Sequence, residues 1–215
     1  MSRTQSPINP ITSFVVLAWW CMMLFIMQQD AQAIEEAAYQ VEFSDGDFEV
    51  RAYEPHILAE VTFDDFDEAQ SQGFRLLFKY ISGGNRSQAK IAMTAPVGQE
   101  PVSEKIAMTA PVGQVQAENG WRLSFMMPAS YTMETIPQPM NDAVTLREVP
   151  ARRIAAVRYS GRWTRTGFEK HKALLAAWMA SKNLGADGEA VWARYNAPFT
   201  PWFWRRNEVL IPIAP

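Results

Sequence analysis

The sequence contains very little cysteine and histidine. Its 215 residues include one cysteine, Cys21, and two histidines, His56 and His171. A single cysteine excludes a disulfide framework and a cysteine-rich metal site within the chain. The two histidines stand too far apart in the sequence for a short His-x-x-His ligand pair, which removes most metal-dependent hydrolase classes.

The sequence also lacks an excess of positive charge. Lys and Arg total 20 against 23 Asp and Glu, so the formal net charge is -3. Nucleic-acid binding depends on a basic face that releases counterions, so no nucleic-acid partner is expected. With 48% hydrophobic residues, the composition is typical of one globular domain of ordinary size that carries an appendage.

The only long hydrophobic run lies near the N-terminus. Residues 11–27 carry no charge, follow Arg3 and precede Ala31-Gln32-Ala33, a pattern typical of a secretory signal peptide. We expect cleavage after Ala33, so residues 1–33 form the signal and residues 34–215 a single domain. The alternative is an uncleaved membrane anchor. Both interpretations predict export. With cleavage, the domain is periplasmic or secreted; without cleavage, it is anchored in the inner membrane and faces the periplasm.

Hydrophobic periodicity predicts two rounds of strands, helix and strands. The predicted strands cover residues 39–43, 48–53, 57–63, 121–127, 144–149, 153–159, 191–195 and 207–213. Helical period predicts helices over 65–82 and about 164–183. This order predicts an α+β domain in which an antiparallel sheet curls against two helices. A crevice between the halves is then a default location for a small amphipathic ligand.

A ten-residue segment, KIAMTAPVGQ, occurs twice without change, at 90–99 and 105–114. One repeat of this length does not define a solenoid, which needs several units. Alternating residues predict a short strand in each copy, with a loop containing Pro101 between them. Residues 128–142 contain three prolines and are predicted to lack regular structure.

The first predicted helix has two adjacent apolar stripes, which is wider than one sheet contact requires. Phe74 and Phe78 belong to the second stripe and lie beside the cations Arg75 and Lys79. One interpretation assigns both stripes to the core. The other assigns the two phenylalanines to a ligand groove with a cationic rim.

Each histidine also has two interpretations. His56 falls on the outer face of its predicted strand and is expected at the surface. His171 falls in the middle of the apolar face of the second helix. A core histidine bonded to the backbone is the commoner explanation for such a position, and an iron ligand is the alternative.

Several motifs occur in a characteristic order: Gly83-Gly84-Asn85, KIAMTAPV at 90–97, Tyr159-Ser160-Gly161, YNAPFTP at 195–201 and RRNEV at 205–209. In this order and spacing they resemble the SOUL haem-binding protein family, over about residues 39–213. The resemblance implies a pseudo-duplicated, distorted antiparallel β-barrel flanked by two α-helices, similar to bacterial effector-binding domains. It also implies non-covalent binding of haem or a related tetrapyrrole in a shallow hydrophobic groove beside the first helix.

The sequence departs from the family pattern at two positions. Ala52 stands where some relatives carry a histidine that can ligate iron, and Thr200 stands where some carry a cation that can meet a propionate. Lys79 matches the family position. The resulting haem-binding hypothesis comprises Phe74, Arg75, Leu77, Phe78, Lys79 and His171. It leaves the metal ligand open.

Other functions compete with haem binding as a carrier, buffer or sensor. A general binding module for amphipathic small molecules or lipids would use the same groove without selectivity for iron porphyrin. A small-molecule hydrolase using Glu208 and Tyr195 is a further alternative, although no nucleophile motif supports it. The aromatic residues 202–204 are expected to pack against the end of the barrel, with an exposed protein-binding anchor as the alternative. No catalytic residue is predicted.

Overall fold

The computed structural model describes residues 34–88 and 103–214. The chain divides into two units, residues 1–33 and residues 34–215, and the account below concerns the second. The predicted signal segment, the first decapeptide copy and Pro101 lie outside the described residues. Within the described part of the chain, no helix has the length and apolar character needed to cross a membrane.

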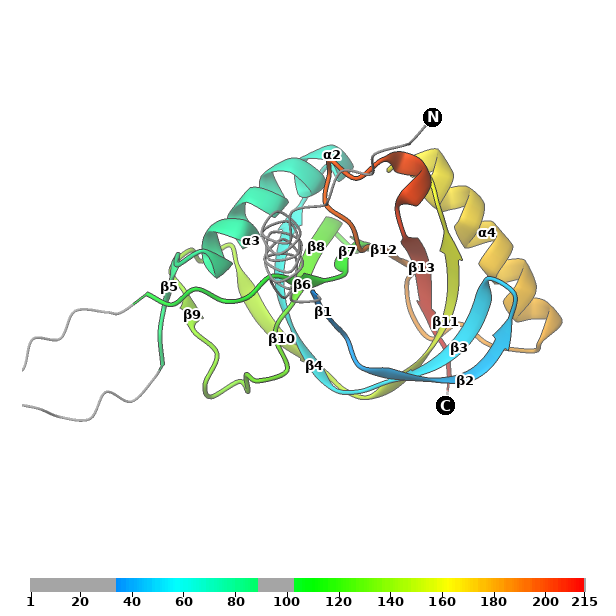
Figure 1. Cartoon of the computed structure of the whole chain (residues 1–215), viewed down its shortest axis with the longest axis horizontal. Coiled ribbons are helices and arrows are strands. Elements are labelled where there is room, and N and C mark those ends of the chain that lie inside the picture. The colour runs from blue at the N-terminus through cyan, green and yellow to red at the C-terminus, as the bar shows by residue number, and fades with distance from the viewer. Residues whose placement is uncertain (1–33, 89–102, 215) are drawn as a thin grey trace, which may run out of the picture. The chain divides into compact units, whose positions relative to one another are not determined.

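A nine-stranded antiparallel sheet forms the domain (Figure 1). Its strands are β2 (Tyr39–Asp45), β3 (Phe48–Tyr53), β4 (His56–Phe63), β7 (Val112–Ala117), β8 (Gly120–Met126), β10 (Thr145–Val149), β11 (Arg152–Tyr159), β12 (Val191–Arg194) and β13 (Asn207–Pro212). Their order across the sheet is β10-β4-β8-β7-β12-β13-β11-β3-β2. The sheet curls, and both helices pack on one of its faces.

The remaining elements are short strands and helices. The strand pairs are β1 (Glu35–Glu36) with β6 (Thr109–Ala110), and β5 (Asn85–Arg86) with β9 (Gln138–Pro139). The first helix comprises α2 (Phe66–Glu68), a π-helical segment η1 (Ala69–Gly73) and α3 (Phe74–Ile81); the second is α4 (Arg165–Ser181), and a 3-10 turn η2 covers Trp202–Trp204.

The sheet order is symmetric about the β7–β12 pair. The set β3, β4, first helix, β7, β8 corresponds to the set β10, β11, α4, β12, β13. The first strand of each set lies in the other half, because β3 pairs with β11 and β10 pairs with β4. Pro55 and Pro150 lie at the two crossovers, where a residue without an N–H group ends the ladder. The predicted pseudo-duplication is therefore confirmed, and it includes an exchange of strands between the halves.

Side-chain caps define where the helices begin. The carboxylate of Asp65 accepts hydrogen bonds from the backbone N–H groups of Asp67 and Glu68. Thr164 caps α4 by accepting from the N–H group of Gly167. Each cap satisfies N–H groups that have no partner within the helix. The predicted helices over 65–82 and 164–183 are confirmed, and they begin at the caps Asp65 and Thr164.

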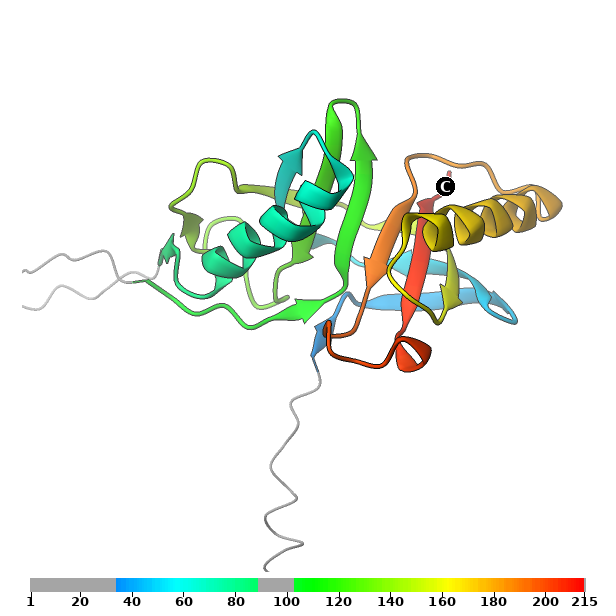
Figure 2. The same ribbon diagram turned by 90° about the horizontal axis from the view of Figure 1, so that it is seen from above.

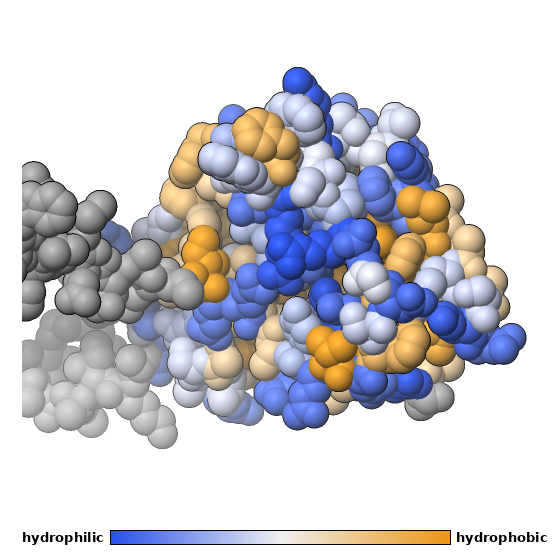
Figure 3. Space-filling view, turned by 45° about the vertical axis from the view of Figure 1, so that its right-hand side comes forward, coloured by the Kyte–Doolittle hydropathy of each residue, from blue (hydrophilic) through white to orange (hydrophobic). Residues whose placement is uncertain are grey.

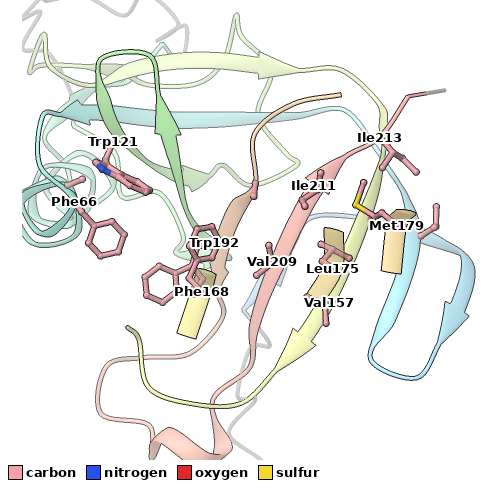
Figure 4. Close-up of a cluster of buried hydrophobic side chains, with 14 residues drawn as sticks. Phe66, Trp121, Val157, Phe168, Leu175, Met179, Trp192, Val209, Ile211 and Ile213 are labelled. Carbon is pink, nitrogen blue, oxygen red and sulfur yellow. The ribbon is translucent and has the colours of Figure 1, made fainter. Parts of the chain in front are cut away.

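Two clusters fill the layer between the sheet and the helices. Under α4, aromatic residues from both halves meet, with Phe66 stacked on Trp192 and edge-on to Trp121 (Figure 4). Leu175 of α4 is fully buried among the valines and isoleucines of β11 and β13. Under α3, a second cluster contains the fully buried Leu77 and Leu123. Both clusters lie within the compact unit formed by residues 34–215.

Two predicted segments differ from the structure. The second decapeptide copy is not one strand, because it bends at Pro111 into β6 and β7. The proline-rich segment 128–142 contains the short strand β9, which pairs with β5. The segment is otherwise turns and irregular backbone, as predicted.

The two neighbouring leucines of α4 offer a test of this packing. We expect Leu175→Ala to lower the free energy of unfolding by about 2–5 kcal/mol, because it opens a cavity in the core. Leu174 is 46% exposed, so Leu174→Ala should cost less than about 1 kcal/mol. Urea unfolding of residues 34–215 measures both. If both variants lost the same free energy of unfolding, the burial of Leu175 and the exposure of Leu174 on α4 would be contradicted.

Candidate functional site

An exposed aromatic pair lies on the outer face of α3. The rings of Phe74 and Phe78 stack with centroids 6.1 Å apart and an interplanar angle of 10°. Phe78 is 46% exposed, whereas Phe74 is partly buried and packs edge-on against Phe125. Phe78 is therefore the side chain of the pair that a ligand can cover without disturbing the core.

Arg75 and Lys79 extend from the same helix into solvent. No ion pair found among the described residues includes either cation. Their positions one turn apart form a row beside the Phe74–Phe78 row. Leu77, the remaining predicted wall residue of α3, is fully buried in the core, so it supports the surface and does not face a ligand. We call the face made by Phe74, Arg75, Phe78 and Lys79 the α3 surface.

His171 lies on α4, in the other half of the molecule. Its ring stacks on Tyr159, with centroids 3.7 Å apart and planes 8° from parallel. Nδ1 lies 2.7 Å from the carbonyl oxygen of Gly167, a hydrogen bond that leaves the lone pair of Nε2 free when Nδ1 carries the proton. The side chain borders a shallow hollow of about 590 Å3, together with Phe48 and Arg158.

The structure thus separates the predicted site residues into two groups. Helices α3 and α4 cover opposite ends of the sheet in both views (Figures 1 and 2). Their buried residues also belong to different clusters. His171 and the α3 surface therefore cannot contact one tetrapyrrole in this structure.

The face of the sheet opposite the helices contains a pocket between the two halves, where the sequence predicted a crevice. Its volume is about 90 Å3, and its apolar lining includes Leu58, Met126, Ile154, Val191 and Leu210. Glu60 on this face is only 5% exposed and accepts two hydrogen bonds from Arg147, at 2.8 and 2.7 Å. The acid is therefore paired within the pocket.

A larger cavity of about 280 Å3 lies near the crossover from β3 to β4. It has an apolar part that includes Met126, Met127 and Met133. Its lining also contains five glutamates: Glu35, Glu36, Glu54, Glu134 and Glu148. His56 borders both cavities and is half-buried rather than exposed as predicted; burial lowers the pKa of its imidazole.

Glu208 is the centre of a buried polar network. Its carboxylate is fully buried and accepts hydrogen bonds from Arg51 at 2.7 and 3.1 Å, from Tyr195 Oη at 2.8 Å and from Arg206 at 3.0 Å. Burial alone would raise the pKa of Glu208, but the hydrogen bonds and charges of Arg51 and Arg206 outweigh it and lower the pKa. A buried carboxylate with a lowered pKa that is paired with two arginines is unsuited to general acid or base catalysis. The network holds the strands together and offers no support for a hydrolase.

The loop between β12 and β13 exposes four large aromatic side chains. The exposed fractions are 89% for Phe199, 49% for Trp202, 52% for Phe203 and 72% for Trp204. The prediction that residues 202–204 pack against the barrel end is therefore wrong, because none of the three residues of η2 is buried. We call residues 198–205 the aromatic loop.

The described residues contain no group of three or more His, Cys, Asp or Glu side chains arranged to hold a metal ion. The imidazoles of His171 and His56 each bond a backbone carbonyl oxygen through Nδ1, so among the described residues neither Nε2 atom has a hydrogen-bond partner.

Solved structures of other proteins share this fold. The C-terminal domain of EcmrR matches with a TM-score of 0.53 and 10% identity, covering 82% of this chain and 98% of that chain. A hydrolase from Listeria innocua matches with a TM-score of 0.51 and 10% identity, covering 80% and 94%. At this level of identity the similarity establishes the fold and nothing about activity. A search of curated proteins gave no match.

The chain belongs to the SOUL family: the model described as "SOUL heme-binding protein" matches residues 34–212. This match covers both halves of the sheet, both helices and the aromatic loop. The predicted family and fold are confirmed.

The Glu208 network predicts a specific dependence of stability on pH. Glu208→Gln removes the buried carboxylate that pairs with both Arg51 and Arg206 and leaves Arg51 with Glu49 only, so we expect a loss of about 3–5 kcal/mol in the free energy of unfolding at pH 7. A carboxyl with a lowered folded pKa stabilises the fold above its unfolded value, near 4.5, and that contribution disappears as the pH falls. The difference in the free energy of unfolding between the wild type and Glu208→Gln should therefore become smaller below pH 4.5.

Glu42→Gln is the matched control for this experiment. Glu42 pairs with Arg153 at 2.9 Å, but both side chains are more than a third exposed, so the loss should stay below about 1 kcal/mol. Urea unfolding of all three proteins at pH 7 and at pH 3 measures the differences. A Glu208→Gln deficit that is the same at both pH values would contradict an ionised Glu208.

Proposed function

We propose that this domain binds haem or a related tetrapyrrole non-covalently on the α3 surface, as a carrier or buffer that does no chemistry itself. The observation that carries the proposal is the half-exposed Phe78 ring, stacked on Phe74 and bordered by two cations, Arg75 and Lys79, that form no ion pair with another described residue. Membership of the SOUL family supports the ligand class.

The chemistry of a porphyrin matches this surface in two respects. Its flat apolar face can lie on the stacked rings, since offset aromatic stacking adds about 0.5–1.5 kcal/mol beyond burial of area. Its two propionates can meet Arg75 and Lys79 through charge-assisted hydrogen bonds. Both interactions are independent of iron, and the α3 surface contains no histidine to ligate it.

Three hollows in the described part of the domain are less suited to this ligand. The pocket between the halves holds about 90 Å3, well below the roughly 300–1,000 Å3 of typical ligand sites. The cavity of about 280 Å3 is lined by five glutamates, which would repel propionates. The hollow beside His171 is larger and contains Arg158, but Asp47 also borders it. On the α3 surface, a half-exposed aromatic ring lies beside two cations that form no ion pair with any other described residue.

A parallel titration with haemin and with iron-free protoporphyrin tests the proposal. We expect both to bind residues 34–215 with similar affinity. Phe78→Ala should raise both dissociation constants about tenfold, because the wall loses its exposed ring. The unfolding free energy should change by less than about 1 kcal/mol, since the ring is half-exposed. Absorbance follows haemin, and fluorescence quenching follows protoporphyrin.

His171→Ala is the control that separates the two groups of predicted residues. It lies on α4, so the variant should bind both tetrapyrroles as the wild type does. Binding of haemin alone, abolished by His171→Ala and unaffected by Phe78→Ala, would move the site to the hollow on α4. Binding of neither tetrapyrrole would remove haem from the function.

The cavity at the β3–β4 crossover favours a second candidate function, a binding module for small amphipathic cations. Three methionines give it an adaptable apolar wall, and five glutamates give it negative charge. Calorimetric titration with a hydrophobic quaternary ammonium compound tests this candidate. Binding that Glu134→Gln with Glu148→Gln weakens would support it, and the absence of heat would exclude it.

A further inference from the structure

The aromatic loop is not used by either candidate function. It lies between β12 and β13, and none of its residues belongs to the α3 surface or lines the crossover cavity or the hollow beside His171. Exposed apolar residues elsewhere on the domain stand as separate patches surrounded by hydrophilic ones on the face drawn in Figure 3. Four neighbouring aromatic rings at 49–89% exposure are therefore a distinct feature that calls for a partner.

Hydrogen bonds fix the loop in this exposed position. Arg205 donates from Nε to the carbonyl oxygen of Thr200 at 2.8 Å and from its terminal nitrogen to that of Pro198 at 2.7 Å. The N–H group of Gly161 donates to the carbonyl oxygen of Trp202 at 3.1 Å. The guanidinium of Arg205 also lies 4.2 Å from the ring centre of Trp163. The aromatic rings are thus presented by a braced backbone, and their exposure does not come from a frayed segment.

We propose that the aromatic loop is a membrane-contact surface, which places Phe199, Trp202, Phe203 and Trp204 in the interfacial layer of a phospholipid bilayer. Tryptophan and phenylalanine are enriched where a protein meets the headgroup region, because their rings bury apolar area at the boundary of the acyl chains. Arg162 is exposed, and its guanidinium lies 5.8 Å from the ring centre of Trp202. From this position it can meet lipid phosphates.

The position of the loop in the domain supports a bilayer as the partner. Arg206, which directly follows the loop, forms an ion pair with Glu36 of β1 at 2.8 Å. Figure 2 shows β1 and η2 at the same lower edge of the domain. In the sequence, β1 is preceded by the apolar residues 11–27, with only six residues between Met27 and Ile34. Those six residues span at most about 25 Å, so a segment that delivers the chain to a membrane connects at the edge that carries the loop.

The size of the loop argues against a second copy of the chain as its partner. A specific protein interface buries about 800 Å2 on each partner and is broad enough for 20–30 residues. The aromatic loop has eight residues, and none of the three residues of η2 is buried. Such a small exposed surface suits insertion into a deformable lipid layer better than a specific interface with a second folded copy.

Vesicle flotation tests the proposal on residues 34–215, which form a compact unit without the N-terminal segment. Vesicles of phosphatidylcholine and vesicles of phosphatidylethanolamine with phosphatidylglycerol are used without tetrapyrrole, so the result is independent of the proposed function. We expect the wild type to float with both and more strongly with the anionic vesicles. Phe199→Gln with Trp204→Gln should lower the partition coefficient at least about tenfold, while circular dichroism and the unfolding midpoint remain those of the wild type.

Met140→Gln with Leu174→Gln is the matched control, since these side chains are 60% and 46% exposed outside the loop. It should float like the wild type. A loop variant that floats as well as the control, or a wild type that binds neither vesicle, would overturn the proposal. Size-exclusion chromatography tests the remaining alternative. If the wild type forms dimers, binds no vesicles, and loses its dimers in the loop variant, the loop belongs to an interface with a second copy and the proposal is overturned.

Discussion

The buried Arg51–Glu208 ion pair limits ligand binding on one half of the face of the sheet opposite the helices. Both side chains are nearly inaccessible, so their charges depend on ion pairs: Arg51 pairs with Glu208 and Glu49, and Glu208 pairs with Arg51 and Arg206. Glu208 also accepts from Tyr195 and Arg206, which uses its remaining acceptor sites. The network thereby joins β3, β13 and the end of β12, and through Glu36 it reaches β1. A face closed by such a network is structural, which leaves ligand binding to other surfaces.

The periodicity of the sequence predicts where the strands and helices lie but not which strands pair with each other. Residues 57–63 alternate clearly, and β4 forms there with Ile57, Ala59 and Val61 facing α3. The same alternation would fit any neighbouring strand, so it cannot reveal that β10 and β3 exchange halves. The exchange depends on contacts between residues about 90–100 positions apart, which local propensity does not encode. The motifs of the family predicted the barrel because they carry this long-range information.

The same limit explains the errors at the candidate sites. His56 and Glu60 fall on the polar side of their strand, yet both are at least half-buried because that side faces the other half across a pocket. Glu60 is tolerated there because Arg147, 87 positions later, forms a bidentate pair with it. A helical wheel likewise assigned His171 and Phe78 to apolar arcs correctly, but it could not show that their helices cover opposite ends of the sheet.

The openness of the α3 surface bears on the proposed role. A flat ligand on Phe74 and Phe78 is covered on one face only, so burial at about 25 cal/mol per Å2 provides roughly half the hydrophobic stabilisation of an enclosed pocket. Without an axial bond from α3, nothing else holds the iron. Such a site releases its ligand readily, which suits a carrier or buffer and not permanent retention of a cofactor. A domain held near a bilayer by its aromatic loop would exchange an apolar porphyrin with the membrane over a short distance, since the lipid is the competing solvent for the ligand.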